Sequence, residues 1–279
     1  MTVRVSCRRP SRAFATVVLV VATALVATAA PALAGPKGSG LDYVALGDSY
    51  AAGVGAAPAP GSGDCRQSNS SYPALWAARN RPRSFVSKAC SGSNAGGVLF
   101  RQARAVSKDT DLVTITVGGN DVGFAPVIAT CTAARDDASC LRAVHGGEHI
   151  ARLFAPGGLI SVIVAARLQS AHAQIVVLGY PKLYGPGSCR GVRNVPNAAR
   201  RAALDRAADV LNGALADGAR RYGAQFVDVS GRFAGHGLCG ADPWLTPPSK
   251  PLRRTDYHPT AAGYARGYLP ALSAAVTRS

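Results

Sequence analysis

The residues of this chain that are best suited to chemistry lie in three short motifs, in the order serine, asparagine and histidine. The motifs are Gly47-Asp48-Ser49-Tyr50, Gly118-Gly119-Asn120-Asp121 and His258-Pro259. A serine hydroxyl is a poor nucleophile unless a base such as histidine takes its proton and nearby donors stabilise the oxyanion that forms. The motifs supply each of these groups, so the sequence predicts a serine nucleophile with a histidine base.

Ser49 directly follows the apolar run 41–46, where a buried strand would end and a helix could begin. A helix N-terminus points N–H groups and positive potential at an anion, so the Ser49 N–H is a candidate oxyanion donor. The alternative is that Asp48 and Ser49 only cap this helix, as such residues often do. Taken alone, the motif leaves both interpretations open.

Two further oxyanion donors are expected after other strands. The Asn120 side chain ends the run 111–117, and the glycine pair before it lets the backbone approach a ligand closely. The neighbouring Asp121 carboxylate can tie down the same loop. Gly92 follows the run 84–87, and its N–H is a third candidate donor. Each signal is ordinary by itself, because Asn-Asp is a common turn sequence.

His258 precedes Pro259, which can open a helix, so the imidazole would lie on a loop just before that helix. A general base must reach the serine within hydrogen-bond distance, and it works best when a third group fixes its tautomer. Asp256, two residues earlier, is the candidate for that third group.

The elements that must position these residues are five short runs rich in Val, Ile, Leu and aromatic residues, a pattern typical of buried parallel strands. The runs are 41–46, 84–87, 111–117, 174–178 and 225–229. Helical patterns lie between or after them at 72–80, 159–171, 196–222 and 259–276. This alternation predicts an α/β fold with three layers. Ligands of such sheets bind beyond the carboxyl ends of the strands, where Ser49 and Asn120 both lie.

Residues 1–34 are typical of a secretion signal. Four arginines precede the apolar stretch 13–30, and Ala32-Leu33-Ala34 supplies a small-x-small cleavage pattern. An uncleaved membrane anchor is the alternative, but Pro31 and the cleavage pattern favour removal. The export route stays open, because Arg8-Arg9 also suggests the twin-arginine path. Residues 35–279 can then form one domain but not two ordinary ones, and we expect a secreted, extracellular monomer.

Cys7 leaves with the signal, and an even number of cysteines remains in an exported chain, which predicts three disulfides. These cysteines are Cys65, Cys90, Cys131, Cys140, Cys189 and Cys239. The residues alone do not choose among the possible pairings, although nearest-neighbour pairing is the simplest. A zinc site is the alternative, but no Cys-x-x-Cys spacing occurs.

The formal net charge of +16 falls to 27 − 15 = +12 when four arginines leave with the signal, and this charge favours anionic surfaces. It is compatible with transient contact with a membrane or lipid surface. The basic residues are scattered, without a dense run or interleaved aromatics, so no nucleic-acid partner is expected. His145-Gly146-Gly147-Glu148-His149 matches the H-x-x-E-H metalloprotease pattern. That mechanism needs a continuous helix and adjacent glycines are poor helix formers, so no metal is expected.

Together the motifs resemble the SGNH, or GDSL, hydrolase family, and within it the secreted actinobacterial lipase and esterase group. The resemblance covers essentially the whole mature chain in four ordered blocks. It implies a three-layer αβα sandwich, flavodoxin-like, with a five-stranded parallel sheet. It implies Ser49 as nucleophile and His258 as base, with an oxyanion hole formed by the Ser49 N–H, the Gly92 N–H and the Asn120 amide. It also implies ester hydrolysis through an acyl-enzyme, without metal or cofactor.

The chain departs from the family pattern at the acid. The usual acid stands three residues before the histidine, where this chain has Thr255. Some members of this group resemble dyads in which a main-chain carbonyl near the histidine replaces the acid. The carbonyl of Thr255 or Asp256 could do so here, or the Asp256 carboxylate could turn in; we expect a carbonyl. Related lipases pair sequential cysteines, which implies the disulfides Cys65–Cys90, Cys131–Cys140 and Cys189–Cys239.

The same machinery cleaves any ester that its pocket admits. The apolar candidates Tyr50, Phe124, Trp244 and Leu245 favour acyl chains, and hence a lipase or carboxylesterase. A tryptophan that plugs the edge of a core is at least as common as one that lines a pocket. A phospholipase and a polysaccharide O-acetylesterase are the enzymatic alternatives. The alternative outside enzymes is a secreted binding protein with a dead site.

Overall fold

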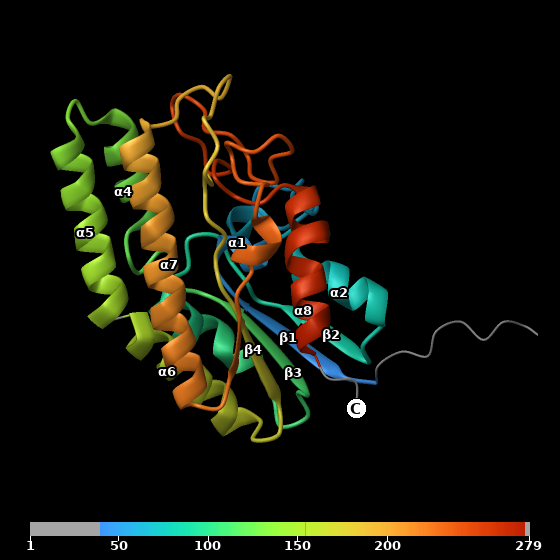
Figure 1. The fold of residues 1–279 in the computed structure, drawn as a ribbon. Coiled ribbons are helices and arrows are strands. Elements are labelled where there is room, and N and C mark those ends of the chain that lie inside the picture. Colours follow the sequence, from blue (N-terminus) through green and yellow to red (C-terminus); the bar gives the residue numbers. More distant parts are fainter. Residues whose placement is uncertain (1–39, 154, 277–279) are drawn as a thin grey trace, which may run out of the picture. The chain divides into compact units, whose positions relative to one another are not determined.

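The centre of the fold is a parallel five-stranded sheet in the order β2-β1-β3-β4-β5 (Figure 1). The computed structural model describes residues 40–153 and 155–276, so the predicted secretion signal lies outside the described residues. The strands are β1 (Asp42–Gly47), β2 (Ser84–Ser87), β3 (Leu112–Thr116), β4 (Gln174–Leu178) and β5 (Gln225–Val227). The central strands β1, β3 and β4 are buried along almost their whole length, because helices cover both faces. The predicted three-layer α/β fold is confirmed.

Two groups of helices sandwich the sheet (Figure 1). On one face α2 packs against α8, and on the other α6 packs against α7, with α5 against α7 beyond the sheet. The helices are α1 (Ser49–Ala52), α2 (Tyr72–Asn80), α3 (Ala95–Gly97), α4 (Phe124–Ala133), α5 (Asp137–Leu153), α6 (Ala155–Gln169), α7 (Ala198–Arg221) and α8 (Leu269–Ala275). Short 3₁₀ or π turns are η1 (Gly63–Cys65), η2 (Val98–Gln102), η3 (Ala103–Ala105), η4 (Ser230–Phe233) and η5 (Gly263–Tyr268).

Side-chain caps explain where the two most regular helices begin. The Asn197 side chain accepts a hydrogen bond from the Arg200 N–H, so α7 starts at Ala198 rather than at the predicted residue 196. Ser71 caps α2 in the same way, by accepting from the Ala74 N–H. Such caps satisfy backbone N–H groups that have no partner inside the helix.

Helices α4 and α5 are absent from the sequence prediction. The expectation that Gly146 and Gly147 interrupt a helix is wrong, because α5 runs through both. Its contacts with α4 and α7 outweigh the low helix propensity of two glycines. The stretch 137–169, which contains α5 and α6, is long and apolar enough to cross a membrane by length and composition. In the structure both helices pack against α7.

The carboxyl ends of β1 and β3 lie side by side, and Gly47 makes the turn out of β1 possible. Its φ of +135° lies in the region that favours glycine. A Cβ at this position would lie 2.2 Å from the Thr116 carbonyl oxygen, which accepts a hydrogen bond from the Asp48 N–H. The glycine of the first motif is therefore required by backbone packing, and it delivers Ser49 to the edge of the sheet.

Candidate active site

Ser49 and His258 meet at the carboxyl end of the sheet, although 209 positions separate them in the chain. Ser49 is the first residue of α1, and His258 lies on the loop before η5. The Ser49 Oγ is 2.7 Å from the His258 Nε2, and the His258 Nδ1 is 2.9 Å from the Asp256 carbonyl oxygen. Because a carbonyl only accepts, Nδ1 carries the proton and Nε2 is left to accept the serine proton.

The protonation state of His258 suits a base. Burial lowers the pKa of this imidazole to about 4, while its hydrogen bond to the Asp256 carbonyl acts in the opposite direction. The positive charge of Arg66 adds to the lowering. His258 is consequently neutral at neutral pH, which is the state that can remove a proton from Ser49.

The Asp256 carboxylate faces away from the imidazole. Its Oδ2 accepts hydrogen bonds from the Ser249 N–H at 2.8 Å, the Ser249 hydroxyl at 2.6 Å and the Arg253 N–H at 2.9 Å. The Thr255 carbonyl is also engaged elsewhere, since it accepts from the backbone N–H of His258. Among the predicted partners of the imidazole, the Asp256 carbonyl makes the 2.9 Å hydrogen bond with Nδ1. The Asp256 carboxylate instead closes the loop 249–256.

The predicted oxyanion donors lie in one cleft with the nucleophile. Ser49, Gly92, Asn120 and His258 all line it. The Asn120 amide donates one hydrogen bond to the Ser93 carbonyl at 2.9 Å, and its second N–H remains for a ligand. Gly92 has a φ of +81° and open space where a Cβ would be, so a ligand can approach its N–H closely.

Tyr180 joins the serine motif to the asparagine motif. Its hydroxyl donates to the Asp48 Oδ2 at 2.6 Å and accepts from the Gly119 N–H at 3.0 Å. The Asp48 Oδ1 accepts from the Tyr50 N–H at 2.9 Å, which caps α1. Burial raises the pKa of Asp48 to about 7, against the lowering effect of the bond from Tyr180. The backbone on both sides of the oxyanion site is thus held by one buried network.

Gln102 provides a second link. Its side chain accepts from the Gly47 N–H at 2.7 Å, and it donates to the Gly47 carbonyl and the Ser93 hydroxyl at 3.0 Å each. Sequence reasoning missed Gln102 and Tyr180. Tyr180 follows the run 174–178 much as Ser49 and Asn120 follow theirs, and that position could have identified it. Gln102 gives no comparable signal, because its partners become neighbours only through folding.

A second, apolar cleft leads from Ser49 between α4, α5 and α7. Its lining includes Tyr50, Phe124, Val127, Ile128, Val144, Leu183, Leu204, Ala207, Ala208 and Leu211. The predicted pocket residues Trp244 and Leu245 do not line it. Trp244 stacks on His236 and packs against Phe233, so it plugs the edge of the core. Tyr50 and Phe124 line this cleft, as predicted for residues of an acyl pocket.

The structure contains three disulfide bonds, Cys65–Cys90, Cys131–Cys140 and Cys189–Cys239, which are the pairs that the resemblance implies. The first lies closest to the site. It fixes the segment before Gly92 to the last residue of η1, and the Ser91 N–H also donates to the Cys65 carbonyl at 3.1 Å. In the H-x-x-E-H segment of α5, both imidazoles are exposed and Glu148 is buried, so the three side chains do not converge.

Comparisons with known proteins agree with this geometry. A family model described as the GDSL-like lipase/acylhydrolase family matches residues 45–266. A lipase of Streptomyces rimosus is 42% identical over 248 residues, which cover 88% of this chain and 91% of the relative. The crystal structure of phospholipase A1 from Streptomyces albidoflavus NA297 superposes with a TM-score of 0.80 at 41% identity, covering 85% of this chain and 100% of that one. The extracellular lipase from Streptomyces rimosus gives 0.78 at 44%, with the same coverage.

Proposed function

This chain belongs to the GDSL-like lipase/acylhydrolase family and is a carboxylic ester hydrolase, and we propose that it is a secreted lipase or carboxylesterase acting through an acyl-enzyme on Ser49. The resemblance found in its motifs is thereby confirmed. The proposal rests mainly on the 2.7 Å contact of the Ser49 Oγ with the His258 Nε2. Gly92 and Asn120 line the same cleft.

The first half of the reaction forms the acyl-enzyme. The Ser49 Oγ attacks the ester carbonyl carbon while its proton passes to the His258 Nε2. The carbonyl oxygen becomes an oxyanion, which the Ser49 N–H, the Gly92 N–H and the Asn120 amide stabilise by hydrogen bonds. The bond to the alcohol then breaks, and the imidazolium returns the proton to the leaving oxygen.

In the second half, water donates a proton to His258 and attacks the acyl carbon. The second intermediate then collapses and releases the carboxylic acid, while the imidazolium returns its proton to the Ser49 Oγ. The Asp256 carbonyl accepts from the Nδ1–H throughout, and so stabilises the imidazolium by a hydrogen bond in place of an acid. His258 with Ser49 thus works as a dyad supported by the main chain.

The apolar cleft between α4, α5 and α7 supports an acyl chain as the substrate portion next to Ser49. Burial of each methylene contributes about 0.8 kcal/mol, so a chain that fills this cleft is bound more tightly than acetate. Hydrolysis of p-nitrophenyl esters from acetyl to palmitoyl by the mature protein, beside a Ser49→Ala control, tests this directly. No hydrolysis of any ester would refute the proposal.

A matched pair of variants tests the cleft itself. Ala208 lines it, whereas Ala202 lies exposed on the same helix α7. We expect Ala208→Phe to reduce hydrolysis of long-chain esters by about tenfold or more while acetyl ester hydrolysis is retained, because the ring fills space that the chain needs. Ala202→Phe keeps the wild-type profile. An unchanged profile in Ala208→Phe would place the acyl chain elsewhere.

A polysaccharide O-acetylesterase is the second candidate, and preference for acetyl esters over all longer ones would favour it. A binding protein with a dead site would fail to react at Ser49 with a fluorophosphonate probe. Secretion is supported by the signal-like residues 1–34, the three disulfides and the extracellular lipase of Streptomyces rimosus. Mass spectrometry of the protein exported by its host would locate the mature N-terminus.

A further inference from the structure

Tyr50, the residue after the nucleophile, contacts the loop of the base as well as lining the apolar cleft. Its hydroxyl donates a hydrogen bond to the Tyr257 carbonyl at 2.9 Å, although 207 positions separate the two residues in the chain. Its ring lies against the His258 imidazole, with 5.0 Å between the ring centroids and 42° between the ring planes. One side chain of the serine motif thus touches both the base and the peptide that leads into it.

Tyr257 has an unusual backbone conformation. Its φ of +64° lies in the left-handed region, which residues other than glycine rarely adopt. Because φ is the rotation about the N–Cα bond, it decides where the carbonyl of the preceding residue points. Here that residue is Asp256, whose carbonyl accepts the hydrogen bond from the His258 Nδ1 at 2.9 Å. The acceptor of the imidazole proton is therefore aimed by the strained conformation of Tyr257.

Two hydrogen bonds from outside the loop hold Tyr257 in this conformation. On its N-terminal side, the Tyr257 N–H donates to the Thr246 carbonyl at 2.9 Å. On its C-terminal side, the Tyr257 carbonyl accepts from the Tyr50 hydroxyl. The peptides before and after the strained residue are thus each fixed once. Strained residues persist where their surroundings over-determine them, so removal of one of these bonds would let the loop relax.

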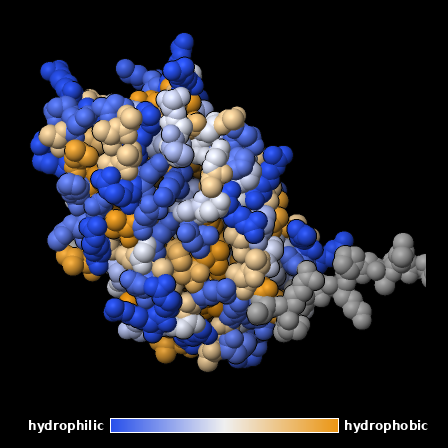
Figure 2. Space-filling model, in the orientation of Figure 1, coloured by the Kyte–Doolittle hydropathy of each residue, from blue (hydrophilic) through white to orange (hydrophobic). Residues whose placement is uncertain are grey.

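Burial protects the bond between the two tyrosines. Tyr50 is 3% exposed and Tyr257 is 2% exposed, beneath an end of the molecule from which hydrophilic side chains project (Figure 2). Burial also raises the pKa of Tyr50, so its hydroxyl keeps the proton that it donates. Since water has little access here, the Tyr257 carbonyl would lack a donor without this hydroxyl, which is unfavourable for a buried polar group.

Tyr50 is itself fixed on the side of the nucleophile. Its N–H donates to the Asp48 Oδ1 at 2.9 Å, and its ring packs edge-on against Tyr180 with 5.1 Å between the centroids. Tyr180 in turn donates to the Asp48 Oδ2. The Tyr50 hydroxyl therefore extends from a well-held part of the site and links the position of α1, which carries Ser49, to the loop that carries the base.

We propose that Tyr50 is a positioning residue for the base, whose hydroxyl fixes the Tyr257 peptide so that the Asp256 carbonyl faces the His258 Nδ1. The inference rests on the proposed mechanism and names a residue on which its geometry depends. In a triad, the side chain of an acid orients the imidazole. A main-chain carbonyl that takes this role points wherever its peptide is held, and here the Tyr50 hydroxyl helps to hold it.

The variant Tyr50→Phe tests the hydroxyl alone, because it keeps the ring that contacts His258 and lines the apolar cleft. We expect kcat for p-nitrophenyl butyrate to fall by about tenfold while KM changes by less than about twofold, since the base is misplaced but the acyl site is kept. The same fall is expected for acetyl and longer esters. A fall confined to some chain lengths would refute the proposal, because Tyr50 would then act through binding of the acyl chain.

Two other tyrosines provide matched controls. The Tyr268 hydroxyl is buried and also donates to a backbone carbonyl, that of Gly179, at 2.8 Å. The Tyr184 hydroxyl donates to the side chain of Tyr257 at 3.2 Å and leaves its peptides untouched. Tyr268→Phe and Tyr184→Phe should each keep kcat within about twofold. An equal loss in Tyr268→Phe would refute the proposal, as would a Tyr50→Phe protein that does not fold, because the hydroxyl would then serve stability.

Proton NMR of the resting enzyme observes the proposed contact without turnover. The His258 Nδ1–H should give a slowly exchanging downfield resonance, which His258→Ala assigns by its loss. We expect this resonance to weaken or move upfield in Tyr50→Phe and to stay unchanged in the two controls. An unchanged resonance in Tyr50→Phe would refute the positioning role, even where kcat falls.

The two readouts separate this inference from the function on which it rests. Ester hydrolysis by the wild type with normal kcat and an unchanged resonance in Tyr50→Phe would refute the role of Tyr50 and leave the esterase in place. A wild type that hydrolyses no ester would refute the proposed function, while the resonance would still decide whether the Tyr50 hydroxyl directs the Asp256 carbonyl to His258.

Discussion

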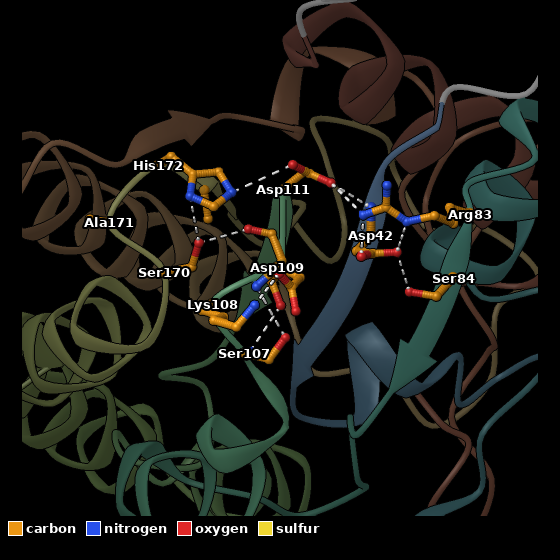
Figure 3. Close-up of polar contacts among 12 residues, drawn as sticks. Asp42, Arg83, Ser84, Ser107, Lys108, Asp109, Asp111, Ser170, Ala171 and His172 are labelled. Atoms are coloured by element: carbon orange, nitrogen blue, oxygen red, sulfur yellow. Dashed lines mark hydrogen bonds and ion pairs between the residues drawn. The ribbon is translucent and has the colours of Figure 1, made fainter.

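Two sets of serine, histidine and aspartate lie at opposite ends of the same sheet. At the carboxyl end the Ser49 Oγ lies 2.7 Å from the His258 Nε2. At the amino end His172 lies between Ser170 and Asp111, with 3.4 Å from its Nδ1 to the serine Oγ and 3.5 Å from its Nε2 to the carboxylate Oδ1 (Figure 3). By residue type alone, the second set is the more complete triad.

The hydrogen bonds of the second set prevent it from acting as one. The Ser170 hydroxyl is buried and donates to the Thr110 carbonyl at 2.8 Å, so its proton is already engaged. Ser170 and His172 line neither the apolar nor the catalytic cleft, whereas Ser49 lines both. A catalytic serine is thus identified by a hydroxyl proton that can pass to a histidine and by an opening to a cleft that admits the substrate. The types of the neighbouring residues are a weaker guide.

The carboxylates at the two ends also differ in charge. Asp42 begins β1 and receives hydrogen bonds from Arg83 and Ser84, which hold the pKa of its carboxyl below the ordinary value (Figure 3). Asp48 follows the same strand, and burial raises its pKa to about 7. At the amino end, Arg83 and Ser84 keep the Asp42 carboxyl ionised at the surface. At the carboxyl end, Asp48 is buried and accepts hydrogen bonds from Tyr180 and from the Tyr50 N–H.

The largest effect expected separates the two serine sets. Ser49→Ala or His258→Ala should lower kcat for p-nitrophenyl butyrate by at least about a thousandfold, because each removes one partner of the proton transfer. Ser170→Ala and His172→Ala are matched controls at the amino end, and per folded protein they should retain activity within about twofold. A large loss of activity in the Ser170 or His172 variant would contradict the conclusion that the amino-end set takes no part in catalysis.

Asn120 should give the next largest effect. Asn120→Ala removes an oxyanion donor that the amino-end set lacks, and it should lower kcat by about a hundredfold. Since the amide also holds the Ser93 carbonyl, circular dichroism and fluorophosphonate labelling of Ser49 check that the nucleophile stays in place. A variant that labels normally and turns over at the wild-type rate would remove Asn120 from the oxyanion hole.

The strands and the reacting side chains were predictable from local signals. Runs of apolar residues marked all five strands within two residues, and glycine beside Ser49 and Asn120 marked the places where the chain leaves the sheet. Packing decided what the sequence prediction missed. Helices α4 and α5 form because they cover the apolar cleft and α7, although a glycine pair lowers the local propensity of α5.

The supporting residues were less predictable because their roles depend on distant partners. The Tyr180 hydroxyl donates a hydrogen bond to Asp48, which lies 132 positions away in the sequence. The Gln102 side chain accepts one from the Gly47 N–H, which lies 55 positions away. The orientation of the Asp256 carboxylate depends on Ser249 and on how the loop folds back, which no spacing rule reveals. The spacing of Asp256 and His258 in the sequence suggested a nearby acid, but the fold of the loop directs the Asp256 carboxylate to Ser249 instead.

The pH dependence of activity should reflect the burial of His258. The neutral form is the base, and since burial lowers the pKa to about 4, that form persists as the pH falls. Roughly nine tenths of the imidazole is neutral at pH 5, against about 3% for an ordinary histidine. The acid limb of kcat/KM for p-nitrophenyl butyrate should therefore lie near pH 4. A limb near pH 6.5 would show that the ring is solvated in solution.

The smallest effect is expected at Asp256, where the comparison with Asp111 is sharpest. Asp111 offers its carboxylate to His172, whereas Asp256 offers His258 its carbonyl and directs its carboxylate to Ser249 and the Arg253 N–H. Asp256→Asn keeps that carbonyl and one side-chain acceptor oxygen for the loop. We therefore expect kcat for p-nitrophenyl butyrate to fall by less than about tenfold. A loss of about a thousandfold, with the fold intact by circular dichroism, would show that the carboxylate turns to His258 during the reaction and that the enzyme uses a triad.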